Sequence, residues 1–182
     1  MNSFRRQLPN VLTMLRILVI PPLIGAFYMD GPIWAWVPFF LFGTASVTDW
    51  LDGYLARQMQ TGSRFGKIMD PIADKLLVVS VILLLADSEL LNGWNLVPAI
   101  IILCREMLIS GLREFMAEQA VQLPVTRLAK WKTAAQMGAL VWTLAPIHEA
   151  QLAGIGFFWL AALLTIITGW DYVRSSWPHM AD

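Results

Sequence analysis

The segment Asp49–Lys75 reads DWLDGYLARQMQTGSRFGKIMDPIADK and concentrates charge in a chain that is otherwise very apolar. It holds four aspartates, with apolar runs before and after it. The segment is either a solvated loop between two hydrophobic segments or the meeting point of two helix ends that form a reaction centre. The positions of the aspartates around a helix distinguish these interpretations.

Composition indicates a membrane protein. Of 182 residues, 57% are hydrophobic and only 14% are charged, whereas about a quarter of the residues in a soluble domain are charged. The formal net charge is zero, which gives no general attraction to nucleic acid. The single cysteine excludes an intrachain disulfide framework and zinc sites built from several cysteines.

The hydrophobic pattern predicts an all-α integral membrane protein with six transmembrane helices and a single domain over residues 1–182. A transmembrane helix needs about 20 residues, and short polar links separate six apolar stretches of about this length. They cover about 11–29, 33–57, 70–87, 94–117, 130–147 and 151–173.

The charges of the links predict the orientation. Lys and Arg are absent from the links near 30, 87–93 and 148–151, and they are frequent at the amino terminus and near 58–67 and 118–132. Basic residues mark the cytoplasmic side, so both termini are expected there. The third and fourth segments carry charges in their cytoplasmic halves, and a charge at membrane depth costs about 2.5–3.5 kcal/mol. We therefore expect a polar cavity that opens to the cytoplasm.

The aspartates fall in helical phase. At about 100° per residue, one face of the second segment presents two aspartates and three further residues: Asp49, Asp52, Gly53, Ala56 and Arg57. Asp70 and Asp74 share a face of the third segment, and Gly66 lies one turn earlier. A short link makes the two segments antiparallel neighbours, so we expect the two aspartate pairs to converge.

Four converging carboxylates repel one another unless a cation lies among them. Oxygen ligands without His or Cys suit Mg²⁺ or Mn²⁺, and two such ions about 3.5–4 Å apart can hold a phosphate for an in-line displacement. Gly53 and Gly66 leave room for a bulky ligand, and the guanidinium of Arg57 suits phosphate oxygens. The sequence therefore favours a two-metal phosphoryl-transfer centre over a solvated loop.

The pattern Asp49-x2-Asp52-Gly53-x2-Ala56-Arg57-x8-Gly66-x3-Asp70-x3-Asp74 resembles the signature of the CDP-alcohol phosphotransferases at every fixed position. The resemblance implies that Asp49 and Asp70 bridge two metal ions, that Asp52 holds one of them and Asp74 the other, and that Asp74 is the general base. It also assigns a set of residues to the CDP-diacylglycerol donor: Gly53, Ala56, Arg57, Ser63 and Gly66, with Asn10 and Thr13 from the first-helix pattern Pro9-Asn10-x2-Thr13-x2-Arg16.

A second basic set concerns the acceptor alcohol. Arg105 and Arg113 lie eight residues apart in the fourth segment, and Lys130 and Lys132 begin the fifth. Cations at this depth need anionic partners. These partners are either acids of the protein or the phosphate of the acceptor. The candidate acids are Glu106, Glu114 and Glu118.

Both basic segments resemble those of the bacterial phosphatidylglycerophosphate synthases. This resemblance implies sn-glycerol 3-phosphate as the acceptor, phosphatidylglycerophosphate and CMP as products, a homodimer, and a multi-pass location in the bacterial cytoplasmic membrane. Serine, inositol phosphate or a phospholipid hydroxyl are the alternative acceptors within the family.

Two other classes of protein remain as alternatives. A cation or proton transporter would also use aspartates within the membrane. It needs a polar path to the opposite face, whereas the far halves of the third and fourth segments are apolar. A scaffold without catalytic function would leave the spacing of the aspartates unexplained.

Overall fold

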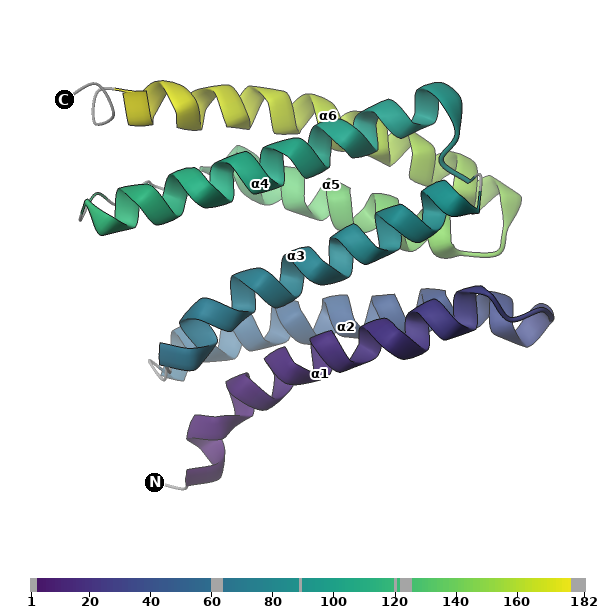
Figure 1. Cartoon of the computed structure of the whole chain (residues 1–182), viewed down its shortest axis with the longest axis horizontal. Helices are drawn as coiled ribbons and strands as arrows, with labels where there is room; N and C mark the ends of the chain where they lie inside the picture. The colour runs from purple at the N-terminus through teal and green to yellow at the C-terminus, as the bar shows by residue number, and fades with distance from the viewer. Residues whose placement is uncertain (1–2, 60–63, 89, 120, 122–125, 178–182) are drawn as a thin grey trace. The chain divides into compact units, whose positions relative to one another are not determined.

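The structure, a computed structural model, describes residues 3–59, 64–88, 90–119, 121 and 126–177; it leaves out the side chains at 3–10, 50–59, 64–65 and 67–68. The described residues form helices joined by short turns, with no β-strand among them (Figure 1). The helices are α1 (Ser3–Phe27), α2 (Pro32–Met59), α3 (Arg64–Asp87), the 3₁₀ turn η1 (Gly93–Asn95), α4 (Leu96–Glu118), α5 (Arg127–Leu144) and α6 (His148–Ser176).

The all-α prediction is confirmed, and each of the six apolar stretches corresponds to one α-helix. The largest differences lie at two helix starts. Helix α1 begins at Ser3 instead of near residue 11, and α3 begins at Arg64 instead of at Asp70. Hydropathy located only the apolar part of each helix, because backbone hydrogen bonding continues into polar sequence.

The chain forms two compact units: unit 1 contains Met1–Asp87 and Leu144–Ile147, and unit 2 contains Ser88–Thr143 and His148–Asp182. In unit 1, α1 packs against both α2 and α3 (Figure 1). Gly31 has a φ of 121°, a value that favours glycine, and Pro32 then begins α2. This tight turn reverses the chain between α1 and α2.

Opposite ends of unit 1 differ in chemistry. The buried face of α1 carries Leu23 and Ala26 toward its carboxyl end, and Thr13 and Arg16 toward its amino end. The neighbouring face of α2 changes in the same way, from the buried Phe42 and Ala45 to Asp49. The buried stripes that hold the helices together are therefore apolar at one end and polar at the other.

A hydrogen bond closes the apolar end of unit 1. The hydroxyl of Tyr28, which follows α1, donates to Asp87 Oδ2 at the end of α3 over 2.8 Å. Helices α1 and α3 are thus connected through their carboxyl ends as well as through their polar ends.

In unit 2, α4 packs against α6 (Figure 1). The buried face of α6 repeats at intervals of three and four residues, as expected for one face of a helix: Phe158, Ala161, Ala162, Thr165, Thr168, Gly169, Tyr172 and Ser176. Helix α5 begins after Thr126, whose hydroxyl caps the backbone N–H of Ala129 at 3.2 Å. A Cβ on Gly154 would overlap Thr143, so glycine permits this close approach of α5 and α6.

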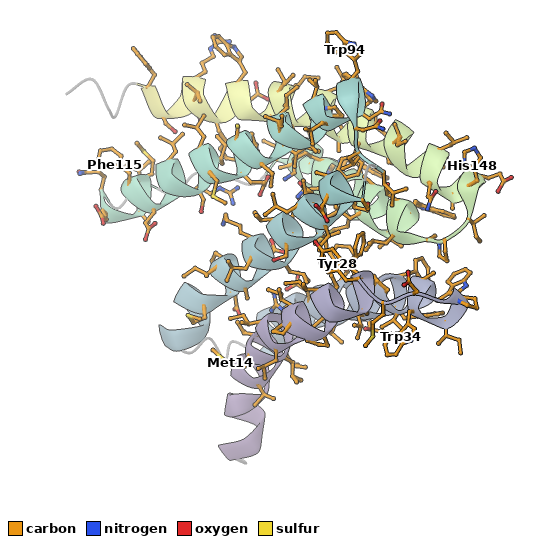
Figure 2. The ribbon with its side chains drawn as sticks, turned by 45° about the vertical axis from the view of Figure 1, so that its right-hand side comes forward. Met14, Tyr28, Trp34, Trp94, Phe115 and His148 are labelled. Atoms are coloured by element: carbon orange, nitrogen blue, oxygen red, sulfur yellow. The ribbon has the colours of Figure 1, made fainter. Side chains whose placement is uncertain are left out.

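Two stretches of the described chain, Gly93–Glu118 and His148–Ser176, are long and apolar enough to cross a membrane. Large apolar side chains are also exposed on both units, including Leu18, Phe40, Leu83, Leu108, Leu163 and Ile166. Trp34 and Trp94 project outward near the first turns of α2 and α4 (Figure 2), where interfacial aromatic residues are common. The other four spans stay a prediction.

Candidate functional site

An ion-pair cluster joins the three helices of unit 1 at their polar end. Arg16 of α1 is 5% exposed, and its guanidinium pairs with Asp49 Oδ1 of α2 and approaches Asp70 Oδ1 of α3 at 3.7 Å. The hydroxyl of Thr13 donates to the same Asp70 oxygen. We call Thr13, Arg16, Asp49 and Asp70 the acid cluster.

The acid cluster brings one predicted aspartate of the second segment, Asp49, and one of the third, Asp70, to the same guanidinium, and the convergence of all four stays a prediction. Sequence reasoning did not identify the residue that joins them. Arg16 appeared only as the last position of the first-helix pattern, and Thr13 was assigned to the nucleotide. The sequence could have indicated both residues, because the spacing of Thr13, Arg16 and Leu23 places them on one face of a helix. A charged residue in a buried stripe requires a partner of opposite charge.

The remaining predicted metal and donor residues are only partly described. Asp74 lies half-buried on α3, one turn after Asp70, and Gly66 is buried on the same helix. The other predicted positions fall in helices whose side chains are left out, or outside the described residues. Asn10 belongs to α1, and Ser63 lies outside the described residues. The positions that belong to α2 are Asp52, Gly53, Ala56 and Arg57.

The described side chains of the acid cluster fit a cation site. Two carboxylates from different helices converge on one positive group, and their oxygens are the ligands that Mg²⁺ and Mn²⁺ prefer. No group of three or more His, Cys, Asp or Glu side chains comes together among the described residues. The side chain of Asp52 is not among them, so the complete set of four ligands stays a prediction.

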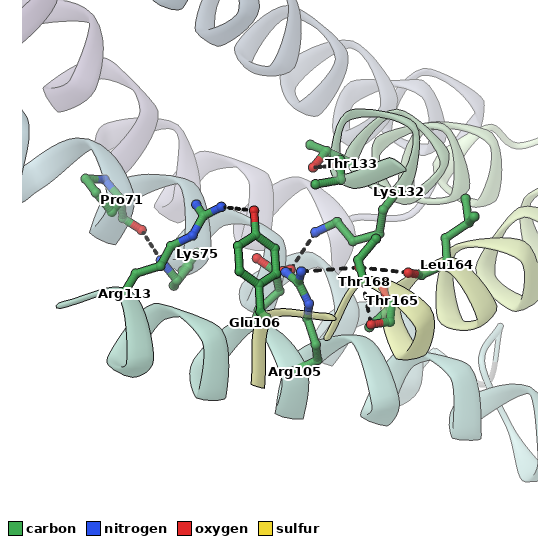
Figure 3. A network of polar contacts seen from close by, with 12 residues as sticks. Pro71, Lys75, Arg105, Glu106, Arg113, Lys132, Thr133, Leu164, Thr165 and Thr168 are labelled. Carbon is green, nitrogen blue, oxygen red and sulfur yellow. Dashed lines mark hydrogen bonds and ion pairs between the residues drawn. The ribbon is translucent and has the colours of Figure 1, made fainter. Parts of the chain in front are cut away.

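Charged side chains of unit 2 meet around Glu106. Its Oε1 accepts hydrogen bonds from Lys132 Nζ of α5 at 2.5 Å and from Arg105 of α4 at 3.0 Å. Lys132 is 4% exposed. Arg105 also donates to Thr168 Oγ1 of α6 at 3.3 Å, so these contacts connect α4, α5 and α6 (Figure 3).

Arg113 completes this group from the next turns of α4. It donates to the hydroxyl of Tyr172 at 2.5 Å, and its guanidinium carbon lies 4.8 Å from the centre of the Tyr172 ring. The guanidinium carbon of Arg105 lies 5.6 Å from the same centre. We call Arg105, Glu106, Arg113 and Lys132 the basic cluster.

The basic cluster shows which acids of the protein pair with the predicted cations. Glu106 is an internal partner for two of the predicted cations, whereas Glu114 and Glu118 are exposed and pair with none of them among the described residues. Lys130 is exposed and lies apart from the cluster. It is two residues from Lys132, which corresponds to about 200° around the helix.

Tyr172 was missed by sequence reasoning. The signal that could have found it is the series of polar residues Thr165, Thr168 and Tyr172 on one face of an otherwise apolar helix. Such a face requires polar partners on the neighbouring helix. Arg105 and Arg113 of α4 are those partners for Thr168 and Tyr172.

Comparison with known proteins identifies the family of this chain. The sequence model of the CDP-alcohol phosphatidyltransferase family matches residues 6–167. A CDP-diacylglycerol–glycerol-3-phosphate 3-phosphatidyltransferase of Cereibacter sphaeroides is 38% identical over 97% of this chain and 98% of its own length. The enzyme of the same name from Rickettsia felis is 44% identical over 93% of this chain and 95% of its own.

A relative with another name is also similar. The CMP-forming cardiolipin synthase of Oryza sativa subsp. japonica is 43% identical over 93% of this chain and 57% of its own length. The family match covers the aspartate signature and the basic cluster together. The chain therefore belongs to the CDP-alcohol phosphatidyltransferase family.

Proposed function

We propose that this protein transfers the phosphatidyl group of CDP-diacylglycerol to sn-glycerol 3-phosphate, giving phosphatidylglycerophosphate and CMP. Membership of the family and the names of the bacterial relatives support this reaction. The observation that carries the choice of acceptor is the charge of the basic cluster. The cluster contains three cations and one carboxylate, and that carboxylate, Glu106, pairs with Arg105 and Lys132, so the net charge of the cluster is two positive charges.

Two surplus charges suit a phosphate monoester. Such a group carries about −1.5 to −2 at neutral pH, and arginine binds it through paired hydrogen bonds. In this proposal Arg105, Arg113 and Lys132 bind the acceptor phosphate. Lys130, predicted with them, contributes at most long-range attraction because it is exposed on α5.

The acid cluster would hold the divalent cations. Asp49, Asp52, Asp70 and Asp74 are the proposed ligands, and Mg²⁺ or Mn²⁺ bound to them would stabilise the charge on the phosphates. Arg16 orients Asp49 and Asp70 through its ion pairs, and Thr13 adds a hydrogen bond to Asp70. Thr13 thereby also supports the site, in addition to its proposed place beside the nucleotide.

Asp74 is the proposed general base. It removes the proton from the acceptor hydroxyl as the hydroxyl oxygen attacks the β-phosphorus, and CMP leaves. Its half-buried position on α3 supports this role, because the base must be accessible to the acceptor. The proposed donor contacts come from Gly53, Ala56, Arg57, Ser63 and Gly66, with Asn10 of α1.

We further propose six membrane spans, a polar cavity open to the cytoplasm and both termini on that side of a bacterial cytoplasmic membrane. The exposed apolar side chains support contact with lipid. The family match crosses both compact units, which supports a single functional domain over residues 1–182. A homodimer is proposed from the family resemblance alone.

A phospholipid hydroxyl is the second candidate acceptor, favoured by the similarity to the cardiolipin synthase. A phosphodiester carries one negative charge and would match only half of the surplus on the basic cluster. Serine has no phosphate. Inositol phosphate has one, carried on a six-membered ring that is bulkier than glycerol. The charge balance therefore ranks glycerol 3-phosphate above the phospholipid and serine.

An acceptor panel tests the proposal. The purified protein receives CDP-diacylglycerol, Mg²⁺ or Mn²⁺ and one acceptor at a time, and the release of CMP is measured. We expect release with glycerol 3-phosphate and little with phosphatidylglycerol, serine or inositol phosphate. Release with another acceptor would contradict the acceptor assignment. Cation flux through reconstituted vesicles without CMP release would favour the transporter alternative.

A further inference from the structure

Tyr172 of α6 contacts both arginines of the basic cluster. The residue is 4% exposed, and the guanidinium carbons of Arg113 and Arg105 lie 4.8 Å and 5.6 Å from its ring centre. The negative face of an aromatic ring attracts such cations. Its hydroxyl oxygen also accepts a hydrogen bond from Arg113 Nη2 at 2.5 Å.

Arg113 depends on Tyr172 more than Arg105 does. Arg105 has Glu106 and Thr168 as further partners. Arg113 is an exposed residue, and no acidic side chain pairs with it among the residues that the structure describes. Since a free arginine side chain samples many rotamers, its contacts with Tyr172 determine where its guanidinium lies.

Tyr172 is itself closely packed. It packs in a hydrophobic cluster with Ile109 and Ala129, to which Leu112 and Val173 add partly buried surface. One turn earlier on α6, Gly169 leaves room for Arg105, because a Cβ there would lie 3.3 Å from Arg105 Cγ. The ring is therefore a buried surface against which the guanidinium groups of Arg105 and Arg113 lie.

We propose that Tyr172 is a positioning residue that orients Arg113, and with it Arg105, to bind the phosphate of the acceptor. The inference rests on the proposed function and extends it to a residue outside the aspartate signature. Tyr172 also lies beyond residue 167, where the match to the family ends. The orientation of the acceptor-binding arginines is thus determined by α6, and their charge is supplied by α4.

Steady-state kinetics of Tyr172→Phe test this role. The variant keeps the ring and removes the oxygen that accepts from Arg113, and loss of a hydrogen bond to a charged group corresponds to about tenfold in affinity. We expect the KM for glycerol 3-phosphate to rise about tenfold, with the KM for CDP-diacylglycerol and kcat changed less than about twofold. Tyr172→Leu, which also removes the ring, should raise the acceptor KM further.

A control separates positioning from general packing. Phe158→Leu removes another fully buried ring from α6, away from the basic cluster. Its melting temperature should fall, because it loses buried apolar surface, while the KM for glycerol 3-phosphate stays unchanged. An equal rise of the acceptor KM in Phe158→Leu and Tyr172→Phe would overturn the inference.

A double-mutant cycle with Arg113→Ala shows whether Tyr172 acts through Arg113. In the Arg113→Ala background, Tyr172→Phe should change the acceptor KM by less than about twofold. A tenfold penalty that persists there would contradict the positioning role. A wild-type protein that does not use glycerol 3-phosphate would contradict the proposed function instead, so the two failures are distinguishable.

Discussion

The acid cluster of unit 1 and the basic cluster of unit 2 use one packing arrangement with opposite charges. Each connects three helices through its contacts, and each contains one residue of the minority sign, Arg16 or Glu106, that pairs with two partners of the majority sign. Each is left with surplus charge. In the proposed function the acid cluster would bind divalent cations, and the basic cluster would bind the phosphate of the acceptor.

The comparison also shows what the minority residue does. Like charges packed together repel, so neither set of majority residues can be held in place by itself. One opposite charge offsets part of this repulsion and fixes the geometry, while charge remains for the ligand. Arg16 and Glu106 are therefore expected to affect geometry and stability more than chemistry.

The largest effect is expected for Asp74→Asn. The amide has nearly the same size as the carboxylate but cannot accept the proton of the acceptor hydroxyl, and loss of a general base costs about 10²–10⁴ in rate. We expect kcat to fall about a thousandfold with little change in melting temperature. Rates of CMP release measure this effect.

Asp87→Asn is the matched control. It makes the same change on the same helix, at the end where Asp87 accepts a hydrogen bond from Tyr28. CMP release should remain close to that of the wild type. Full activity of Asp74→Asn would exclude Asp74 as the base.

A smaller loss is expected when Arg16 is replaced by Met, which removes the minority charge of the acid cluster. Breaking a fully buried pair costs about 3–5 kcal/mol. The Asp49 and Asp70 side chains are 35% and 47% exposed, so we expect a loss of about 2 kcal/mol in the free energy of unfolding. Thermal unfolding in detergent measures it, with the exposed Arg174→Met as control. Equal stability of the two variants would show that Arg16 does not hold the acid cluster together.

The corresponding change in the basic cluster is Glu106→Gln, with a somewhat smaller expected effect of about 1–2 kcal/mol. The amide still accepts a hydrogen bond but no longer compensates two cations. Glu114→Gln removes an exposed acid from the same helix and should leave the melting temperature unchanged. If both variants melted at the wild-type temperature, Glu106 would not have the role that Arg16 has in unit 1.

The smallest effect is expected for Lys130→Ala. Because Lys130 is exposed and lies apart from the basic cluster, we expect the KM for glycerol 3-phosphate to change by less than about twofold. Lys132→Ala should raise it about tenfold, which corresponds to about 1.4 kcal/mol. A similar rise in both variants would restore Lys130 to the acceptor site.

Much of this arrangement could be predicted from the sequence. Each apolar stretch located one α-helix of the described chain, and helical phase placed Asp49 and Asp70 where both approach Arg16, because both predictions depend on short-range periodicity. Contacts between helices were less accessible. Arg16 and Tyr172 lie far along the chain from the partners they contact, and periodicity shows that such residues need a partner without showing which one.

The structure separates Lys130 from Lys132, and the sequence prediction had placed them together for a simple reason. Both residues were grouped by sequence proximity and by their side of the membrane. Helical phase, the argument that was applied to the aspartates, places them on different faces of α5. The burial of Lys132 beside Glu106 and the exposure of Lys130 follow that phase.

The hydrogen bond between Tyr28 and Asp87 has a consequence for adaptation to the bilayer. Helices α1 and α3 are linked there and, at their other ends, through Asp70 to Thr13 and Arg16. Sliding one helix along the other by a single residue, about 1.5 Å, would strain both links. In the proposed six-span arrangement, the pair is therefore expected to respond to a thicker or thinner membrane by tilting as one body, so that Asp70 keeps its place beside Arg16 in membranes of different lipid composition.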